Sequence, residues 1–130
     1  MNRAEELNER LLDFAVRIIG VVGALSRSIV GRHIARQLLR AGTSPGANYE
    51  EACGAESHAD FTHKIGIVLK EVKETRYWLR LARKADLIDP CSRLDPLLDE
   101  VGQLVALFGK SLSTARKRKG ATPYRAHNGK

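Results

Sequence analysis

The chain has 130 residues, of which 43% are hydrophobic and 28% charged, and its net charge is +7. This length suits one domain with a single core, and the composition excludes disordered and collagen-like chains. Two cysteines are too few for a disulfide scaffold. No uncharged run of the first helix approaches the roughly 20 residues that span a bilayer, and the acidic N-terminus is unlike a signal peptide. We therefore expect a cytoplasmic protein without membrane contact.

Residues 4–25 show the apolar periodicity of an amphipathic helix. Apolar side chains recur at steps of three and four along one face, at Ala4, Leu7, Leu11, Phe14, Ile18, Val21 and Leu25. Four further apolar residues are expected to widen this buried face, namely Leu12, Ala15, Ile19 and Val22. Gly20 and Gly23 lower the helix propensity and would allow a second helix to cross closely.

A second helix is expected to follow, with an interruption partway. Ser26 or Ser28 is its candidate N-cap. Its buried stripe is predicted at Val30, Ile34, Leu38 and Ala41. Residues 42–46 (Gly-Thr-Ser-Pro-Gly) are predicted to break or kink the helix, because proline lacks an amide hydrogen and clashes with the preceding turn. The helical pattern then resumes and stops at Gly54.

Residues around this break form a predicted structural motif, made of Ser44, Gly46, Asn48 and Glu51. Asn48 and Glu51 stand three apart, so one helical turn presents both on the same side. Asn48 is a candidate cap of the resumed helix, and Glu51 is expected to pair with Arg40 or Arg80. A polar site at a subunit interface or pore is the functional alternative.

The third helix has the clearest pattern in the chain. Its apolar stripe alternates steps of four and three, at Phe61, Ile65, Val68, Val72, Thr75, Leu79 and Ala82. Ser57 is its candidate N-cap. The Asp89-Pro90 step ends it, because the residue before proline avoids helical angles.

A fourth helix is predicted to start at residues 90–92, with its stripe at Leu94, Leu98, Val101, Val105, Phe108, Leu112 and Ala115. The four segments predict an all-α, antiparallel up-down four-helix bundle over residues 1–115, followed by a basic, disordered tail over residues 116–130. Apolar side chains beside the third stripe (Leu69, Trp78 and Leu81) are compatible both with self-association and with a broad core.

Positive charge is concentrated in two places. One is a row on the third helix, which we call the basic ridge, consisting of Lys70, Lys73, Tyr77, Arg80 and Lys84. The other is the tail, with Arg116, Lys117, Arg118, Lys119 and Arg125. A basic row with one aromatic ring suits a phosphate backbone with an occasional stacked base. The structural alternative is a solvated face that Glu71 and Glu74 partly neutralise.

Two other patterns point weakly to chemistry. Cys53, His58 and His63 match no known zinc-ligand spacing and lack a fourth ligand, so neither a metal nor a cofactor is expected. Arg27 and His33 fit an Arg-x5-His pattern that resembles the catalytic signature of the higher-eukaryote and prokaryote nucleotide-binding family of all-helical ribonucleases. Here the pattern straddles a helix junction, and a ribonuclease is the least favoured of the functions considered.

Two stretches together resemble the bacterial four helix bundle protein family, which is also named for the intervening sequences of large-subunit ribosomal RNA genes. Residues 38–52 (LLRAGTSPGANYEEA) resemble the family's hallmark, and residues 57–64 and 69–81 resemble its third helix. Pro45 stands where we would expect an aliphatic residue in the Ser-x-Gly-Ala-Asn form. The resemblance covers roughly residues 5–115.

The resemblance implies a left-handed bundle that assembles into a ring, commonly a homopentamer, without an established enzyme activity. Relatives include accessory variability proteins of diversity-generating retroelements, which form basic pentameric barrels, bind nucleic acid and engage a reverse transcriptase. We therefore expect a non-enzymatic homo-oligomer that binds RNA or DNA through the ridge and the tail, with a reverse transcriptase as a further candidate partner. The alternative is a protein-interaction scaffold for which nucleic acid is incidental.

Overall fold

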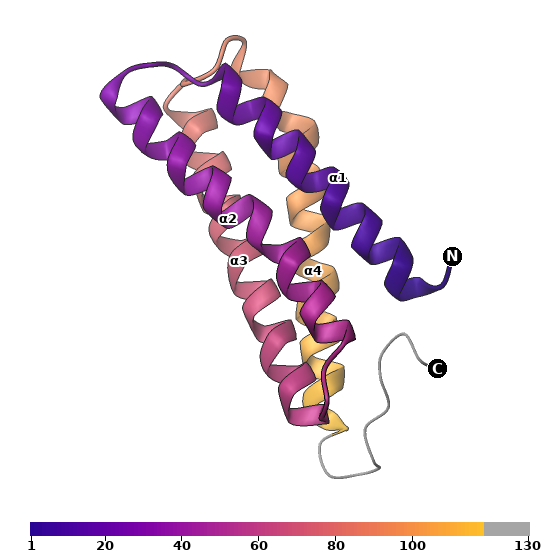
Figure 1. The fold of residues 1–130 in the computed structure, drawn as a ribbon. Helices are drawn as coiled ribbons and strands as arrows, with labels where there is room; N and C mark the ends of the chain where they lie inside the picture. The colour runs from indigo at the N-terminus through magenta and orange to yellow at the C-terminus, as the bar shows by residue number, and fades with distance from the viewer. Residues whose placement is uncertain (119–130) are drawn as a thin grey trace.

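The computed structural model describes residues 1–118, which form four α-helices and no strand. The helices are α1 (Arg3–Ala24), α2 (Ile29–Cys53), α3 (His58–Lys84) and α4 (Asp95–Lys117), and a short 3-10 helix, η1 (Cys91–Leu94), precedes α4. Successive helices run antiparallel along one bundle (Figure 1). The predicted all-α, up-down four-helix bundle is confirmed. None of the helices in residues 1–118 is both long and apolar enough to cross a membrane.

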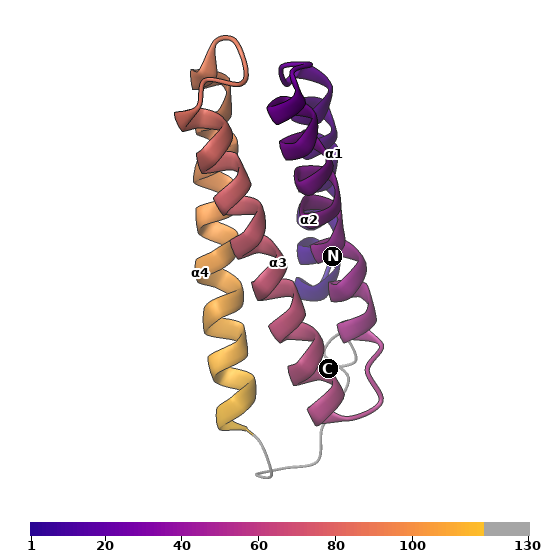
Figure 2. The same ribbon diagram turned by 90° about the vertical axis from the view of Figure 1, so that its left-hand side faces the viewer.

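The helices form two pairs, α1 with α2 and α3 with α4, as Figure 2 shows. The largest contact joins α2 to α3 across the pairs, whereas the contact between α1 and α4 is much smaller. A two-pronged ion pair supports that weaker side, since Arg10 Nε and Nη2 donate to the Glu100 carboxylate at 2.8 and 2.9 Å. Both views show α3 and α4 extending beyond the N-terminal end of α1 (Figures 1 and 2). That end of the bundle is therefore covered by fewer helices.

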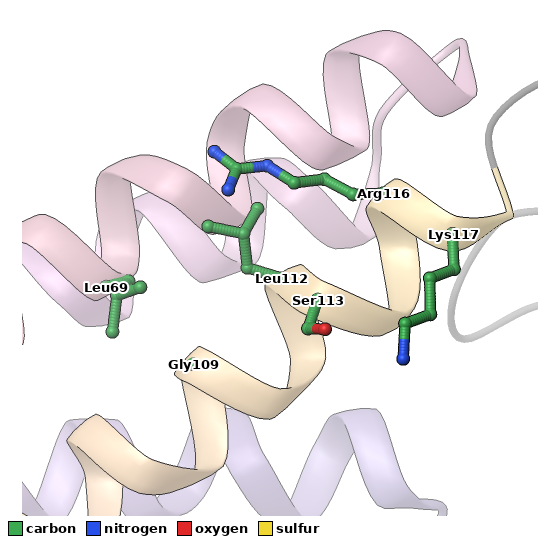
Figure 3. Close-up of a pocket in the computed structure, with 6 residues that line it drawn as sticks. All are labelled: Leu69, Gly109, Leu112, Ser113, Arg116 and Lys117. Carbon is green, nitrogen blue, oxygen red and sulfur yellow. The ribbon is translucent and has the colours of Figure 1, made fainter.

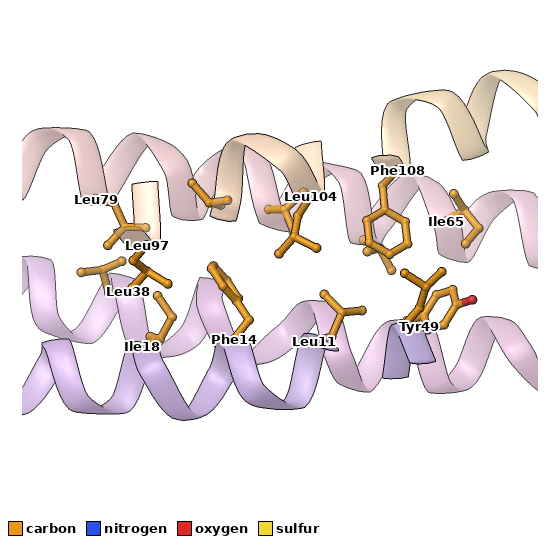
Figure 4. Packing of buried hydrophobic residues seen from close by; sticks show 14 of the residues in the cluster. Leu11, Phe14, Ile18, Leu38, Tyr49, Ile65, Leu79, Leu97, Leu104 and Phe108 are labelled. Atoms are coloured by element: carbon orange, nitrogen blue, oxygen red, sulfur yellow. The ribbon is translucent and has the colours of Figure 1, made fainter. Parts of the chain in front are cut away.

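The core follows the bundle axis, where Leu11, Phe14 and Ile18 of α1 face Leu104 and Phe108 of α4 (Figure 4). The whole predicted stripe of α3 is buried, which confirms that prediction. Its one polar member is Thr75, whose hydroxyl donates to the Glu71 carbonyl at 2.8 Å. Leu69, Trp78 and Leu81 pack partly against the core. The broad-core interpretation therefore holds for these three side chains.

The other stripes differ from the predictions at single positions. In α4, Leu97 and Leu104 are buried in place of the predicted Leu98 and Val105, which are half-buried. Val21 of α1 is also only half-buried, and Val30 of α2 is 57% exposed. A helix turn of 3.6 residues allows a step of either three or four, and packing against the neighbouring helix decides between them.

The expected widening of the α1 stripe is wrong for two of its four residues. Leu12 and Ile19 are 57% and 54% exposed, while Ala15 and Val22 are half-buried. Val16, at 61% exposure, lies between Leu12 and Ile19 on the same side. The side of α1 that points away from the core is therefore apolar in its second half.

Helix α2 continues through Pro45, so the predicted break is wrong. Pro45 is buried, and its packing offsets the hydrogen bond that proline removes, a loss of about 3 kcal/mol in an isolated helix. At Gly42 a Cβ atom would lie 2.7 Å from Ile18 Cγ1, so α1 and α2 cross closely there. The crossing expected at Gly20 and Gly23 is absent among the described residues, because a Cβ atom added at either position would meet no atom of another helix within 4 Å.

The residues of the structural motif form hydrogen bonds within α2 and an ion pair with α3. Asn48 Nδ2 donates to the carbonyl and hydroxyl oxygens of Ser44 at 3.0 and 2.9 Å, so Asn48 does not cap a resumed helix. Glu51 accepts from Lys64 Nζ at 2.6 Å, and the predicted pairing with Arg40 or Arg80 is wrong. Gly46 lies against Leu11 of α1. The motif thus sets how the end of α2 docks on its neighbours.

The helix ends agree with the predicted caps, but two boundaries differ from the prediction. Helix α3 ends at Lys84, before the predicted Asp89-Pro90 step, and α4 includes residues 116 and 117 of the predicted disordered tail. Ser28 accepts from the Gly31 amide and Ser57 from the Asp60 amide, each at 3.0 Å, as predicted. The fourth helical segment begins as η1 at Cys91. Arg116 and Lys117 lie in the last turn of α4 and Arg118 is its C-cap. Lys119 and Arg125 lie outside the described residues.

Candidate nucleic-acid interface

The basic ridge lies along α3 on the side away from the core, and all five of its residues are exposed. The seven buried residues of α3 fix how the helix is rotated, and this leaves the ridge facing solvent. At 1.5 Å per residue, the distance from Lys70 to Lys84 is about 21 Å. The structure therefore brings the ridge residues predicted from the sequence into one continuous row.

The four cations of the ridge have no ion pair within 4 Å to a carboxylate of residues 1–118. The two acids that flank the ridge, Glu71 and Glu74, form ion pairs with Arg40 of α2 instead, Glu71 at 3.5 Å. The pKa of Glu74 is held below its usual value by a hydrogen bond from Trp78, then by Arg40 and by the charge of Lys70. The ridge therefore keeps most of its charge available to a partner.

An aromatic cluster adjoins the ridge, formed by Tyr77, Trp78 and His33. The rings of Tyr77 and Trp78 are 5.1 Å apart at 77°, and those of His33 and Trp78 are 5.9 Å apart at 83°. Of these three residues only Tyr77 belongs to the predicted nucleic-acid site, and His33 was considered only in the ribonuclease pattern. His33 of α2 and Trp78 of α3 are 45 positions apart, so no local sequence pattern reveals their contact. The four-residue spacing of Glu74 and Trp78, in contrast, could have indicated the hydrogen bond between them.

The basic end of α4 borders a hollow at the open end of the bundle. Figure 3 shows its lining, which comprises Leu69, Gly109, Leu112, Ser113, Arg116 and Lys117. Leu69 directly precedes Lys70, so the hollow adjoins the turn of α3 on which the ridge begins. Arg116 and Lys117 also have a structural role, because cations in the last turn interact favourably with the helix dipole.

The residues of the candidate ribonuclease pattern have separate surroundings. Arg27 and Arg32 line a hollow at the turn between α1 and α2. His33 instead packs its ring against Trp78. Arg27 of the Arg-x5-His pattern thus lies at a turn, and His33 of the same pattern takes part in an aromatic contact.

The three candidate zinc ligands are likewise dispersed. Cys53 is buried beside Asn8, and burial raises the pKa of its thiol. His58 Nε2 lies 2.7 Å from the Ala115 carbonyl oxygen, and His63 is exposed. Residues 1–118 contain no group of three side chains arranged to hold a metal ion.

Sequence comparison places the chain among known proteins. The model of the 23S rRNA-intervening sequence protein family matches residues 6–108. The chain belongs to this family. The resemblance inferred from the two stretches is thereby confirmed, and the match includes the whole ridge but ends before Arg116.

A solved structure supports the family assignment. It is a protein with unknown function from the S23 ribosomal protein family of Bacteroides thetaiotaomicron, 32% identical in sequence, with a TM-score of 0.76. The alignment covers 86% of this chain and 99% of that chain. No curated protein matches the chain. The family and the neighbour thus establish the fold, and neither description names a reaction.

Proposed function

We propose that this member of the 23S rRNA-intervening sequence protein family is a non-catalytic nucleic-acid-binding protein that holds an RNA or DNA backbone along the basic ridge. The observation that carries the proposal is the row of four exposed cations without a paired carboxylate in residues 1–118. Such a row attracts a polyanion and releases its counterions on binding. No base-reading motif accompanies it, so sequence specificity is low.

Binding to a labelled RNA of about 20 nucleotides is expected to weaken steeply with salt. Four phosphate contacts correspond to a slope of about −3 in log affinity against log salt, or roughly 50-fold between about 50 and 200 mM. Fluorescence anisotropy measures the affinity, and a gel shows that the RNA stays intact. An affinity independent of salt contradicts the proposal, and RNA cleavage that His33→Ala abolishes supports the ribonuclease instead.

A charge-matched pair of variants separates the ridge from net charge in the same assay. Lys73→Gln with Arg80→Gln removes two ridge cations, and Arg17→Gln with Lys110→Gln removes two exposed cations from α1 and α4. The ridge pair should lower the salt slope by about 1.4, while the control pair changes it little. Equal weakening by both pairs would mean that overall charge, not the ridge, drives binding.

A protein partner is the second candidate, because the side of α1 away from the core exposes Leu12, Val16 and Ile19. Such a partner would compete for this surface with a second copy of the chain. The family resemblance suggests a reverse transcriptase for this role. Removing residues 119–130 distinguishes the two functions, since it takes Lys119 and Arg125 but leaves α4 intact. Because the ridge stays intact, loss of nucleic-acid binding in this variant contradicts binding along the ridge, and retention of the protein partner then favours the scaffold.

We further propose that copies of the chain associate through this apolar side of α1, in the pentameric ring that the resemblance favours. Leu12, Val16 and Ile19 follow one another at steps of four and three and are 57%, 61% and 54% exposed. A Cβ atom added to Gly20 or Gly23 beside them would meet no atom of another helix of residues 1–118 within 4 Å. Burying each aliphatic side chain fully is worth about 1.5–3 kcal/mol, so covering the row favours association.

Light scattering should therefore give a mass several times the 14.4 kDa of one chain. Val16→Glu should shift the mass toward the monomer, because burying an unpaired carboxylate in the contact is costly. Ala106→Glu adds the same charge at an exposed position of α4 and should leave the mass unchanged. A wild-type protein that stays monomeric at high concentration contradicts the association.

A further inference from the structure

We propose that the Tyr77–Trp78 pair, with His33, is a stacking site for an unpaired nucleobase, so that the basic ridge prefers single-stranded RNA or DNA to a duplex. The inference rests on the proposed nucleic-acid function and adds the class of nucleic acid. It depends on the availability of a ring face, on the rigidity of the cluster and on the position of the cations around it.

Tyr77 offers a ring surface to solvent. It is 57% exposed, whereas Phe14, Tyr49, Phe61 and Phe108 are buried. Its ring meets that of Trp78 at 77°, an edge-to-face contact with centroids 5.1 Å apart. Such a contact occupies at most one face of Tyr77. The 57% exposure leaves ring surface on which a planar base can stack, and base–aromatic stacking tolerates any base because every base has a π-face.

The cluster is ordered before any ligand arrives. Trp78 Nε1 donates to Glu74 Oε2 at 3.0 Å, and Arg40 of α2 pairs with the same carboxylate. The ring of His33, also on α2, meets the Trp78 ring edge to face, with the two centroids 5.9 Å apart. Two helices thus hold Trp78, and Trp78 supports Tyr77. A preorganised surface pays little ordering entropy on binding, and Arg40 offsets the negative charge of Glu74 that would repel phosphate.

The ridge supplies phosphate contacts on both sides of Tyr77. Lys73 precedes it by four residues and Arg80 follows it by three, so both are its neighbours on the helix surface, with about 5–6 Å between Cβ atoms. A nucleotide stacked on Tyr77 therefore has a cation near the phosphate on either side. In a duplex each base face is covered by the next pair, so only an unpaired base can use the ring.

Three probes of about 12 nucleotides test the proposal at one salt concentration: a single strand of deoxyadenylates, its duplex with thymidylates, and an abasic strand with the same phosphates. The single strand should bind at least about fivefold more tightly than either of the others, at the lower end of what one stacked base supplies. Trp78 is the only tryptophan in the chain, so quenching of tryptophan fluorescence by the single strand alone reports stacking at this cluster.

Substitutions of Tyr77 complete the test. Tyr77→Leu should reduce binding of the deoxyadenylate strand to the level of the abasic strand and leave abasic binding unchanged, while Tyr77→Phe keeps wild-type preference. Equal affinity of the wild-type protein for the deoxyadenylate and abasic strands overturns the stacking site, and so does full binding by Tyr77→Leu. If none of the three probes binds at this salt concentration, the proposed function itself fails.

Discussion

Replacing Phe108 by alanine is expected to lower the free energy of unfolding by about 3–5 kcal/mol. Phe108 is fully buried and its ring contacts Tyr49 edge to face, with centroids 5.6 Å apart. It also faces α1 on the side where the contact between α1 and α4 is small, so few neighbours can move in to fill the space (Figure 4). Urea unfolding followed by circular dichroism measures the loss.

Leu39→Ala is the matched control for this prediction, since it also removes a large apolar side chain from a helix. Leu39 is 43% exposed, and we expect a change within about 0.5 kcal/mol. A Phe108→Ala variant as stable as Leu39→Ala would mean that α4 does not pack in the bundle as described.

Alanine at Gly31 or Gly42 is expected to destabilise the protein by about 1–3 kcal/mol each, although alanine is the better helix former. A Cβ atom on Gly31 would collide with the carbonyl oxygen of Ser26, which is backbone and cannot rotate away. On Gly42 it would lie 2.7 Å from Ile18 Cγ1 and would push α1 away from α2. The same urea titration measures both variants.

Gly66→Ala is expected to change the free energy of unfolding in the opposite direction. Gly66 lies inside α3, and no described atom lies within 4 Å of the place that a Cβ atom would take, so alanine should stabilise the protein by about 0.5–1 kcal/mol. If Gly42→Ala stabilises the protein as Gly66→Ala does, the close approach of α1 to α2 is wrong.

The exposed position of the basic ridge could be predicted because it depends on a single helix. Once the stripe from Phe61 to Ala82 is buried, residues such as Lys73 and Arg80 must face outward. The surroundings of the ridge could not be predicted in the same way. Arg40 and His33 reach Glu74 and Trp78 from another helix, and only the packing of α2 on α3 brings them there.

The sequence by itself determined the four helices, the cap at Ser57 and the buried side of α3, because these follow from periodicity and from hydrogen bonds between near neighbours. It left Ser26 and Ser28 as alternative caps of α2, and the structure selects Ser28. Tertiary structure alone decided that α2 runs through Pro45, that Leu12 and Ile19 face outward, and that Glu51 pairs with Lys64. In these cases the free energy comes from contacts between helices, and local propensity carries no information about which neighbour a side chain will meet.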